Sequence, residues 1–497
     1  MKTRGLFLST LLIGAAMTGC SNEDVMNLDN EKSLQNSDNF VAVDIVSPTD
    51  VVSRGSEGEY EAGSELENAV SNAMFVFYNA NGAPVDAVAT TTMTWNEGTG
   101  SVDKISSALV VLSDPQTLPT QVVALLNTDL TEIQLESMTL SELQALKGDF
   151  SSEENFVMSN SVYKNGENIV TATPLTDANI CSSETAALAN PVSIPVERVL
   201  AKVEVSKSAS FAVLDPDVAT KLDGESVKFI PTITGMALVE TNPESYLLKD
   251  INNVTGWIGW NDATKFRSYW ANSAVPDQGY KSLSWDAISG KNYDSFSGYC
   301  HENTSETSTK LLVTAQFKAE GAEAPVTVIK YNGTYFTVDG LKNYFSEHYF
   351  KTLTHGEENS NEWRNHMTFV SANTENEWEV KLALVADGET QVPTVNGEVN
   401  IEDVLASINS KTMSQWTDGK CYYYVNVEHF GGEGYEVGVV RNHLYDITIN
   451  SIKGLGTPVF DPTQEINPGT PEEEHYYVAA EVKILKWKIV SQSVALE

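Results

Sequence analysis

Cysteine is scarce in this chain of 497 residues, which contains only four. Cys20 follows the first apolar run, and the other three are far apart in the sequence: Cys181, Cys300 and Cys421. Three widely spaced thiols argue against a disulfide framework and match no metal-binding spacing. We therefore expect these three to be free, buried cysteines, and we expect no metal site and no cofactor.

Basic residues are also few, because 31 Lys and Arg stand against 68 Asp and Glu, giving a net charge of -37. Such a surface repels the phosphates of nucleic acids and anionic membranes. We therefore expect no nucleic-acid partner. Arginine is especially scarce and occurs only at Arg4, Arg54, Arg198, Arg267, Arg364 and Arg441.

Long hydrophobic runs are lacking, and the apolar run at residues 6–16 is too short to span a bilayer. Lys2 and Arg4 precede this run, and Met17-Thr18-Gly19-Cys20 ends it, a pattern typical of an export signal with a lipobox. We predict that residues 1–19 are a lipoprotein signal peptide and that Cys20 carries the lipid. The alternative is an ordinary signal peptide in which the cysteine occurs by chance.

Recognisable motifs of catalysis are missing as well. The seven histidines form no H-E-x-x-H pair, and the chain has no G-x-S-x-G elbow and no Walker loop. Acidic residues are so abundant that no two stand out as the carboxylate pair that a glycosidase needs, which leaves that class open. We predict no catalytic residues and expect that the protein is not an enzyme.

What the sequence does contain is a series of short runs rich in Val, Ile, Tyr and Phe, separated by Asn-Gly and Asp-Gly turn pairs. The runs lie at residues 74–78, 121–127, 196–205, 227–233, 310–317, 326–331, 422–430 and 444–452. This pattern predicts an all-β protein made of sandwiches, not of βαβ units. Helices are expected only at three short places, residues 64–67, 139–147 and 401–408.

Prolines and low-complexity stretches set the expected domain limits. Pro191 and Pro195 follow a stretch rich in Ser, Thr and Ala, so we place a domain boundary there. The expected parts are a tether with a removable first strand over residues 20–54, an N-terminal domain over 55–195, a C-terminal domain over 196–465, and a hinge with a tail strand over 466–497.

Three tryptophans, Trp257, Trp260 and Trp270, lie close together in the sequence beside Tyr269. Exposed rings of this kind can form a platform that stacks on sugars, whereas tryptophans of a β-sandwich more often pack in its core. We favour core packing. A surface glycan-binding lipoprotein that uses these three rings is the alternative from another class of function.

Several segments, taken in order, resemble the fimbrillins of type V pili, in particular the branch that builds short fimbriae. The segments are Tyr422–His429, Gly438–Ile449 with its V-R-N-H-x-Y pattern, Gly454–Pro458, Val196–Val203, Cys300–Thr304 and Val482–Val490. The resemblance implies two transthyretin-like β-sandwich domains in tandem. It also implies a lipoprotein precursor on the outer surface, a cut by an arginine-specific protease, and polymerisation by strand exchange.

The residues around Arg54 fit that mechanism. Residues 40–46 form a β-prone run, and Arg54 follows among small residues, where a protease can engage an extended backbone. A cut between Arg54 and Gly55 would release the first strand and expose an unpaired sheet edge, which is a template for a strand of another chain. The alternative is that Arg54 is an ordinary solvated loop residue.

The tail has the character of a strand that could fill such an edge. Apolar residues alternate along it and then change phase by one residue, so the expected donor residues are Val482, Ile484, Leu485, Trp487 and Ile489. An acidic stretch with Pro and Gly at residues 467–474 would let the tail leave its own domain. The alternative is that the tail folds back as the last strand of its own domain.

Together these features predict a structural subunit of a type V pilus, with the stalk favoured and a tip or anchor subunit as the near alternative. The expected partners are other copies of the chain, the anchor and tip subunits of the pilus, an arginine-specific protease, and the outer membrane through the lipid. The expected location is the cell surface, in a fimbrium that serves adhesion or biofilm formation.

Overall fold

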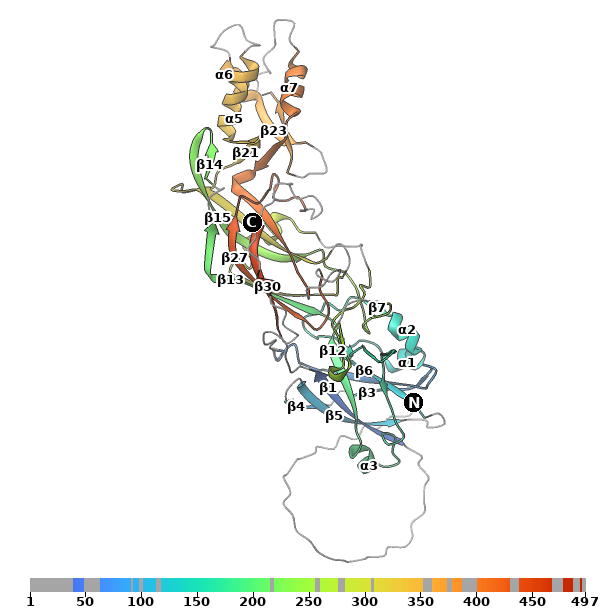
Figure 1. Cartoon of the computed structure of the whole chain (residues 1–497). Coiled ribbons are helices and arrows are strands. Elements are labelled where there is room, and N and C mark those ends of the chain that lie inside the picture. The colour runs from blue at the N-terminus through green and yellow to red at the C-terminus, as the bar shows by residue number, and fades with distance from the viewer. Residues whose placement is uncertain are drawn as a thin grey trace, which may run out of the picture. The chain divides into compact units, whose positions relative to one another are not determined.

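The computed structural model describes most of the chain in two compact units. The described residues are 39–48, 63–90, 93–97, 102–112, 118–214, 219–254, 260–275, 282–304, 308–351, 360–372, 378–386, 400–429, 438–466, 477–485 and 492–493. Unit 1 comprises Met1–Leu200 and Glu244–Ala274, and unit 2 comprises Ala201–Pro243 and Val275–Glu497. Both are built mainly of strands with a few short helices (Figure 1), so the prediction of a β-rich fold is confirmed.

This division corrects the expected domain limits. Residues 196–200 and 244–274 were expected in the second domain but belong to unit 1. The chain returns to unit 1 after Pro243, where β16 (Ser245–Tyr246) pairs with β7 (Lys147–Gly148). Of the two prolines that suggested a boundary, Pro191 directly precedes β12 (Val192–Arg198) and Pro195 lies within it. The limits of the two units depend on contacts between segments that are distant in the sequence, and no local sequence signal marks these limits.

Unit 1 is organised around a nine-stranded sheet with the order β3-β2-β6-β8-β12-β1-β5-β4, in which β11 pairs with β6 off this path. Besides β12, its strands are β1 (Asn39–Pro48), β2 (Ala73–Tyr78), β3 (Pro84–Thr90), β4 (Thr94–Glu97), β5 (Val102–Leu112), β6 (Gln121–Leu126), β8 (Met158–Asn160) and β11 (Thr173–Pro174). Two-stranded pairs complete the unit: β9 (Tyr163–Asn165) with β10 (Asn168–Val170), β17 (Asn261–Asp262) with β18 (Arg267–Ser268), and β7 with β16.

The local sequence explains the centre of this sheet. All six residues of β2 are buried, which accounts for its uninterrupted apolar sequence. The expected Asn81-Gly82 turn joins β2 to β3, with Gly82 at a φ of 75°. The short helices α1 (Glu132–Glu136) and α2 (Leu140–Ala145) each begin with a complete capping box on Thr131 and Thr139. Only α2 was predicted.

Unit 2 packs two sheets against a common apolar core. The five-stranded sheet has the order β19-β13-β27-β29-β30, and the eight-stranded sheet has the order β25-β21-β22-β14-β15-β20-β26-β28. The strands of the first are β13 (Ala201–Leu214), β19 (Ser295–Cys300), β27 (Leu444–Lys453), β29 (Tyr477–Leu485) and β30 (Gln492–Ser493). Those of the second are β14 (Ala219–Leu222), β15 (Glu225–Val239), β20 (Lys310–Ala319), β21 (Val328–Tyr331), β22 (Thr334–Thr337), β25 (Met413–Trp416), β26 (Lys420–Asn426) and β28 (Thr457–Pro458).

The core between the two sheets draws on both. Val203 and Ile447 contribute from the five-stranded sheet, and Phe229, Phe317 and Trp416 contribute from the eight-stranded sheet. The Phe317 ring meets Phe229 edge-on at a centroid distance of 5.0 Å, a favoured arrangement of aromatic rings. Unit 2 is therefore a β-sandwich.

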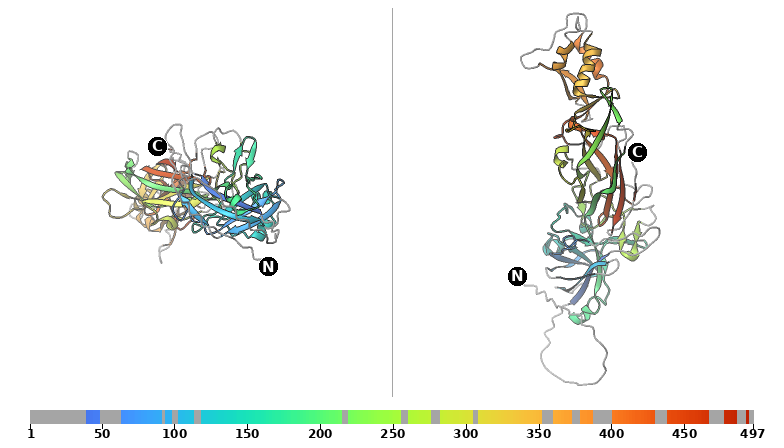
Figure 2. Two further views of the ribbon diagram at one scale, coloured as in Figure 1. Left: turned by 90° about the horizontal axis from the view of Figure 1, so that it is seen from below. Right: turned by 90° about the vertical axis from the view of Figure 1, so that its left-hand side faces the viewer.

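A second, partly helical cluster forms one end of unit 2 (Figures 1 and 2). It combines α5 (Val338–Phe345), the π-helical turn Ser346–Phe350, α6 (Ser360–His366), β23 (Met367–Ser371), β24 (Val380–Leu384) and α7 (Ile401–Asn409). Its own core includes Phe345, Phe350 and Trp363. Of these helices the sequence predicted only α7. No helix among the described residues is long and apolar enough to cross a bilayer.

Most predicted strands are present, with two changes of detail. Residues 196–205 form parts of two strands, because β12 ends at Arg198 and β13 begins at Ala201, where the chain passes from unit 1 to unit 2. The capping pattern at Ser64 and Glu67 closes a turn and starts no helix. In that turn Ser64 N donates to Glu67 Oε2 at 2.6 Å, and Glu67 N donates to Ser64 Oγ at 3.3 Å.

The burial of β2 makes a direct prediction about stability. Phe75 is fully buried, so Phe75→Ala should destabilise unit 1 by about 3–5 kcal/mol through lost burial and the cavity that remains. Ile133 is 80% exposed, and Ile133→Ala should stay within about 0.5 kcal/mol. Hydrogen exchange of the β6 amides reports the unfolding of this sheet. Equal effects of the two variants on that exchange would contradict the assignment of Phe75 to the core of unit 1.

Candidate strand-exchange site

The first described strand, β1, lies inside the sheet of unit 1 and not at its edge. It pairs in parallel with β12 from Val43–Val192 to Val46–Pro195. On its other side it pairs antiparallel with β5, from Asn39–Leu112 to Pro48–Val102. Because the strand is hydrogen-bonded on both sides, its removal would open a slot between β12 and β5 with two rows of unpaired backbone groups.

Both faces of β1 are buried as well. Val41 and Val43 on one face are completely buried, and Ala42, which points to the opposite face, is 1% exposed. Ala42 packs in a small cluster with Leu109 of β5 and Ala187. Ala187 belongs to α3 (Glu184–Leu188), which covers this face of the strand. The slot therefore accepts only a small side chain at the position of Ala42.

The tail of the chain forms β29 within unit 2. It pairs antiparallel with β27 from Leu444–Leu485 to Lys453–Tyr477. Figure 1 labels three other strands of this sheet, β27, β13 and β30. The other neighbour of β29 is the two-residue β30. In the single chain the tail thus folds back onto its own unit, which is the alternative that the sequence analysis gave for it. Donation to another copy stays a prediction for the assembled state.

A likeness between β1 and β29 escaped the sequence analysis. β1 contains Phe40-Val41-Ala42-Val43-Asp44-Ile45, and the tail contains Tyr477-Val478-Ala479-Ala480-Glu481-Val482. The two runs match in kind at every position: aromatic, valine, alanine, small apolar, acidic, β-branched. The signal was readable from the sequence, but it gains meaning only when β1 is known to be an interior strand with an alanine beneath α3.

The motif segments of the C-terminal half converge on one buried polar cluster in unit 2. Glu302 Oε2 and an Arg441 terminal nitrogen form an ion pair at 2.8 Å, and both side chains are at most 1% exposed. Asn303 and Val439 form an antiparallel bridge between the two segments. Gly438 (φ 110°) lies against the Asn303 carbonyl, where a Cβ would be only 2.4 Å from that oxygen. The close approach requires glycine.

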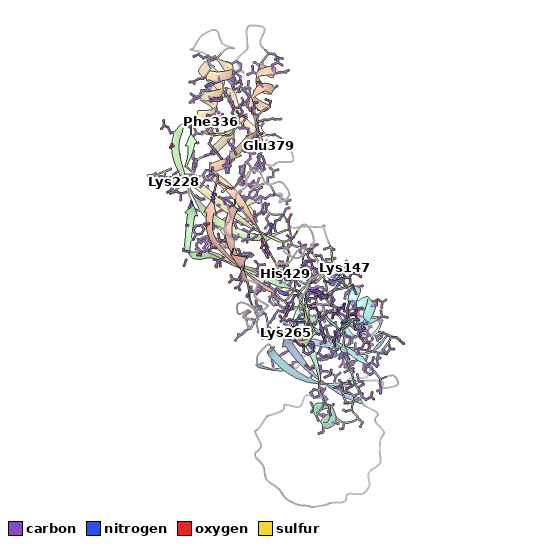
Figure 3. All side chains as sticks on the ribbon, in the orientation of Figure 1. Lys147, Lys228, Lys265, Phe336, Glu379 and His429 are labelled. Atoms are coloured by element: carbon purple, nitrogen blue, oxygen red, sulfur yellow. The ribbon has the colours of Figure 1, made fainter. Side chains whose placement is uncertain are left out.

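The histidines of the motif belong to the same cluster, in which Figure 3 labels His429. His429 Nδ1 lies 2.8 Å from the Tyr445 hydroxyl, which also accepts a hydrogen bond from Val440 N at 2.8 Å. His443 Nδ1 lies 2.8 Å from the Arg441 carbonyl. Burial raises the pKa of Tyr445 well above its usual value, so the phenol stays neutral. The two histidines, Tyr445 and Arg441 are at most 2% exposed, and their arrangement suits a stabilising role.

The cysteines follow the same pattern of burial. Cys300 and Cys421 are free and buried, whereas Cys181 is free and half-buried. Burial raises the pKa of the Cys300 thiol and of the Cys421 thiol to about 12. The prediction of free, buried cysteines is confirmed for these two, and neither is poised as a nucleophile because the thiol form dominates at neutral pH.

Several predicted site residues lie outside the described part of the chain: Cys20, Arg54, Gly55, Trp257, Trp487 and Ile489. The arginines that are described differ sharply in exposure. Arg198, Arg267 and Arg441 are at most 5% exposed, whereas the Arg364 side chain is 32% exposed within α6. Burial therefore hides three of the chain's arginines from a protease that reads arginine side chains.

The alternative of a sugar-stacking platform does not fit two of its three tryptophans. Trp260 is 8% exposed and Trp270 is 9% exposed, and both count among the buried apolar residues. A stacking platform needs an open ring face, which such burial does not leave. The preferred interpretation, core packing, holds for these two.

Comparison with known families gives one match, over the end of unit 2. Residues 414–493 match the family described as major fimbrial subunit protein type IV, fimbrillin, C-terminal. We call residues 414–493 the fimbrillin region after this match. The resemblance to the fimbrillins is confirmed, and the fimbrillin region contains β26, β27, β29 and the Arg441 part of the polar cluster.

Solved structures of other proteins show weaker likeness to the whole chain. One, from Parabacteroides distasonis ATCC 8503, is provisionally described as a cell adhesion protein; it is 14% identical with a TM-score of 0.37, and the match covers 92% of this chain and 98% of that chain. Another is the tip fimbrial protein Mfa3 from Porphyromonas gingivalis, which is 13% identical with a TM-score of 0.30. That match covers 90% of this chain and 100% of the Mfa3 chain. TM-scores this low do not establish a shared fold. A search of curated proteins finds no match.

The buried ion pair joins the fimbrillin region to the rest of unit 2, which gives a test. Glu302→Gln leaves the Arg441 charge buried without a counter-charge, so it should destabilise unit 2 by about 3–5 kcal/mol. The control is Glu320→Gln, which removes the surface pair with Lys228 at 3.7 Å and should cost at most about 1 kcal/mol. Denaturant unfolding measures the free energy of unfolding of both variants. Similarly small losses of that free energy in the two variants would contradict a stabilising role for the cluster.

Proposed function

We propose that this chain is a structural subunit of a type V pilus, favoured as a stalk subunit and with no catalytic activity. In this proposal it is exported as a lipoprotein acylated on Cys20, cut after Arg54, and polymerised by strand exchange on the cell surface. The observation that carries the proposal is the position of β1: it precedes Arg54 in the chain and fills an interior place of a sheet.

Processing at Arg54 fits this position. A cut between Arg54 and Gly55 separates β1 from the rest of unit 1, and only backbone pairing and burial then hold the strand. Three other arginines, Arg198, Arg267 and Arg441, are buried. An arginine-specific protease would therefore find few alternatives to Arg54 among the arginines of the exported chain.

The tail is a suitable replacement for β1. In the proposed exchange, the likeness of the two runs suggests a register in which Ala479 would take the position of Ala42, beside Leu109 and Ala187, and Glu481 that of Asp44. In its own unit β29 has one long neighbour, β27, and the two-residue β30. In the slot it would pair with both β5 and β12, so exchange gains backbone hydrogen bonds. Each is worth about 0.5–1.5 kcal/mol net.

A subunit that can both lose its first strand and donate its tail can continue a chain in both directions, which favours the stalk over the tip and the anchor. Its partners are then other copies of itself, with tip and anchor subunits at the ends. No observation favours the glycan-binding alternative, because Trp260 and Trp270 are buried.

The first test changes the cut. In cells that export the chain, Arg54→Ala should leave the first strand attached and abolish the ladder of polymers on sodium dodecyl sulfate gels run without heating. The wild-type polymer should begin at Gly55 by N-terminal sequencing. Arg54→Lys is the matched control, because it keeps the charge but removes the arginine and should fail in the same way.

A rescue makes this test specific. Replacing residues around Arg54 with the recognition sequence of an unrelated site-specific protease should restore the ladder only after that protease is added. Polymers of uncut chains, or a mature wild-type chain that begins at Cys20 or Ser21, would contradict processing at Arg54.

The second test changes the tail. Ala479→Phe should abolish the ladder, because a phenylalanine does not fit where Ala42 contacts Leu109 and Ala187, whereas Ala479→Ser should polymerise normally. Leu109→Ala makes room in the receiving slot and should restore part of the ladder to Ala479→Phe. Circular dichroism checks that each monomer is folded. A wild-type ladder from folded Ala479→Phe would refute this placement of the tail.

A further inference from the structure

The segment that directly follows the expected cut is held by a buried arginine. Arg198, at the end of β12, is 5% exposed. Its Nε donates to the Glu67 carbonyl at 2.9 Å, and a terminal nitrogen donates to Asn68 Oδ1. Asn68 Nδ2 in turn donates to the Gly63 carbonyl at 2.6 Å. One guanidinium thus fixes the turn over residues 63–68.

A buried asparagine holds the next residues. Asn127 is 7% exposed and has a left-handed backbone with a φ of 56°, a conformation that asparagine tolerates. Its Nδ2 donates to the carbonyls of Ala69 at 2.8 Å and Phe156 at 2.9 Å. Its Oδ1 accepts from Ser71 N at 2.8 Å. Through Phe156 the segment is tied to a different part of unit 1.

These contacts lie beside the place where β1 ends. The parallel ladder runs from Val43–Val192 to Val46–Pro195, and Arg198 follows three residues further along the same strand, β12. The end of β1 and the turn at residues 63–68 are therefore both attached to β12, at points three residues apart along that strand. The first is attached through backbone pairing, and the second through the Arg198 side chain.

We propose that Arg198 and Asn127 are positioning residues for processing: they hold residues 63–72 in place once the chain is cut, so that β1 alone is released. This inference rests on the proposed cut after Arg54. The two side chains bind backbone carbonyls and amides of a segment that would otherwise begin only a few residues after a free chain end, and free ends fray readily. Burial also keeps Arg198 from being cut, which would sever β12.

The experiment compares cut and uncut forms of one full-length chain that carries Cys20→Ala, so that it is obtained without lipid. An arginine-specific protease cuts the chain at Arg54, and hydrogen exchange is followed by mass spectrometry in peptides covering residues 63–72 and, separately, β6. For the otherwise unchanged chain, exchange in residues 63–72 should change less than about two-fold on cutting, because the clamp needs no covalent link to β1.

Two variants weaken the clamp. Arg198→Lys keeps the charge but loses the fork of donors, and Asn68→Ala removes an acceptor at a half-buried position that tolerates change better. Each should raise exchange in residues 63–72 at least about ten-fold in the cut chain and much less in the uncut chain. Arg364→Lys, in α6 of unit 2, is the matched control. It should leave the exchange of residues 63–72 unchanged in both the cut and the uncut chain.

A merely structural role predicts a different result. In that case the variants would also speed hydrogen exchange in β6, and they would do so equally in the cut and the uncut chain. Such a result would overturn the proposal. Unchanged exchange of residues 63–72 in both cut variants would also overturn it. Polymerisation is not needed for this readout, so the clamp can stand if strand exchange fails, and strand exchange can stand if the clamp fails.

Discussion

The structure of unit 1 depends on the occupancy of one place in its main sheet. β1 joins β12 to β5, and without it the nine-stranded sheet would be two separate pieces. Val41 and Val43 are fully buried there, and each such side chain contributes about 1.5–3 kcal/mol through burial. The place must therefore be filled by some strand of the right shape. In our proposal, a cut after Arg54 would turn this requirement into a drive for association, because the unit would regain its sheet by taking a strand from another copy.

In the exchange that we propose, unit 2 meets the opposite requirement, since it must stay folded while β29 changes partner. The described core between its two sheets includes side chains of β13, β15, β20, β26 and β27. The fully buried Glu302–Arg441 pair, with Tyr445 and the two motif histidines, ties the segment before β27 to the end of β19. A buried network of this kind specifies one arrangement of its chain segments. The most recognisable sequence motif of the chain thus belongs to the cluster that stabilises unit 2, and β1 and β29 carry weaker sequence patterns.

The sequence predicted the strands well and the domain limits poorly, for physical reasons. Alternating or continuous apolar runs bounded by turn pairs report a local periodicity, so β2, β6, β20 and β27 were found. The return of residues 244–274 to unit 1 depends on long-range contacts such as Lys249–Glu197, which no local pattern encodes. The burial of Trp260 and Trp270 likewise depends on what packs over them. Within the candidate site, the β-prone character of residues 40–46 was readable, but their interior position was not, and neither was the clamp formed by Arg198 and Asn127, because its partners are far apart in the sequence.

The most direct measurement is the structure of the assembled polymer by electron cryomicroscopy, at a resolution that distinguishes side chains. The account predicts that the strand between β5 and β12 of each subunit belongs to a neighbouring copy, with Ala479 beneath α3 where Ala42 lies in the single chain. Residues 39–48 should be absent from that place. Density for the subunit's own residues 39–48 between β5 and β12, with β29 still paired to β27 of its own chain, would contradict the account.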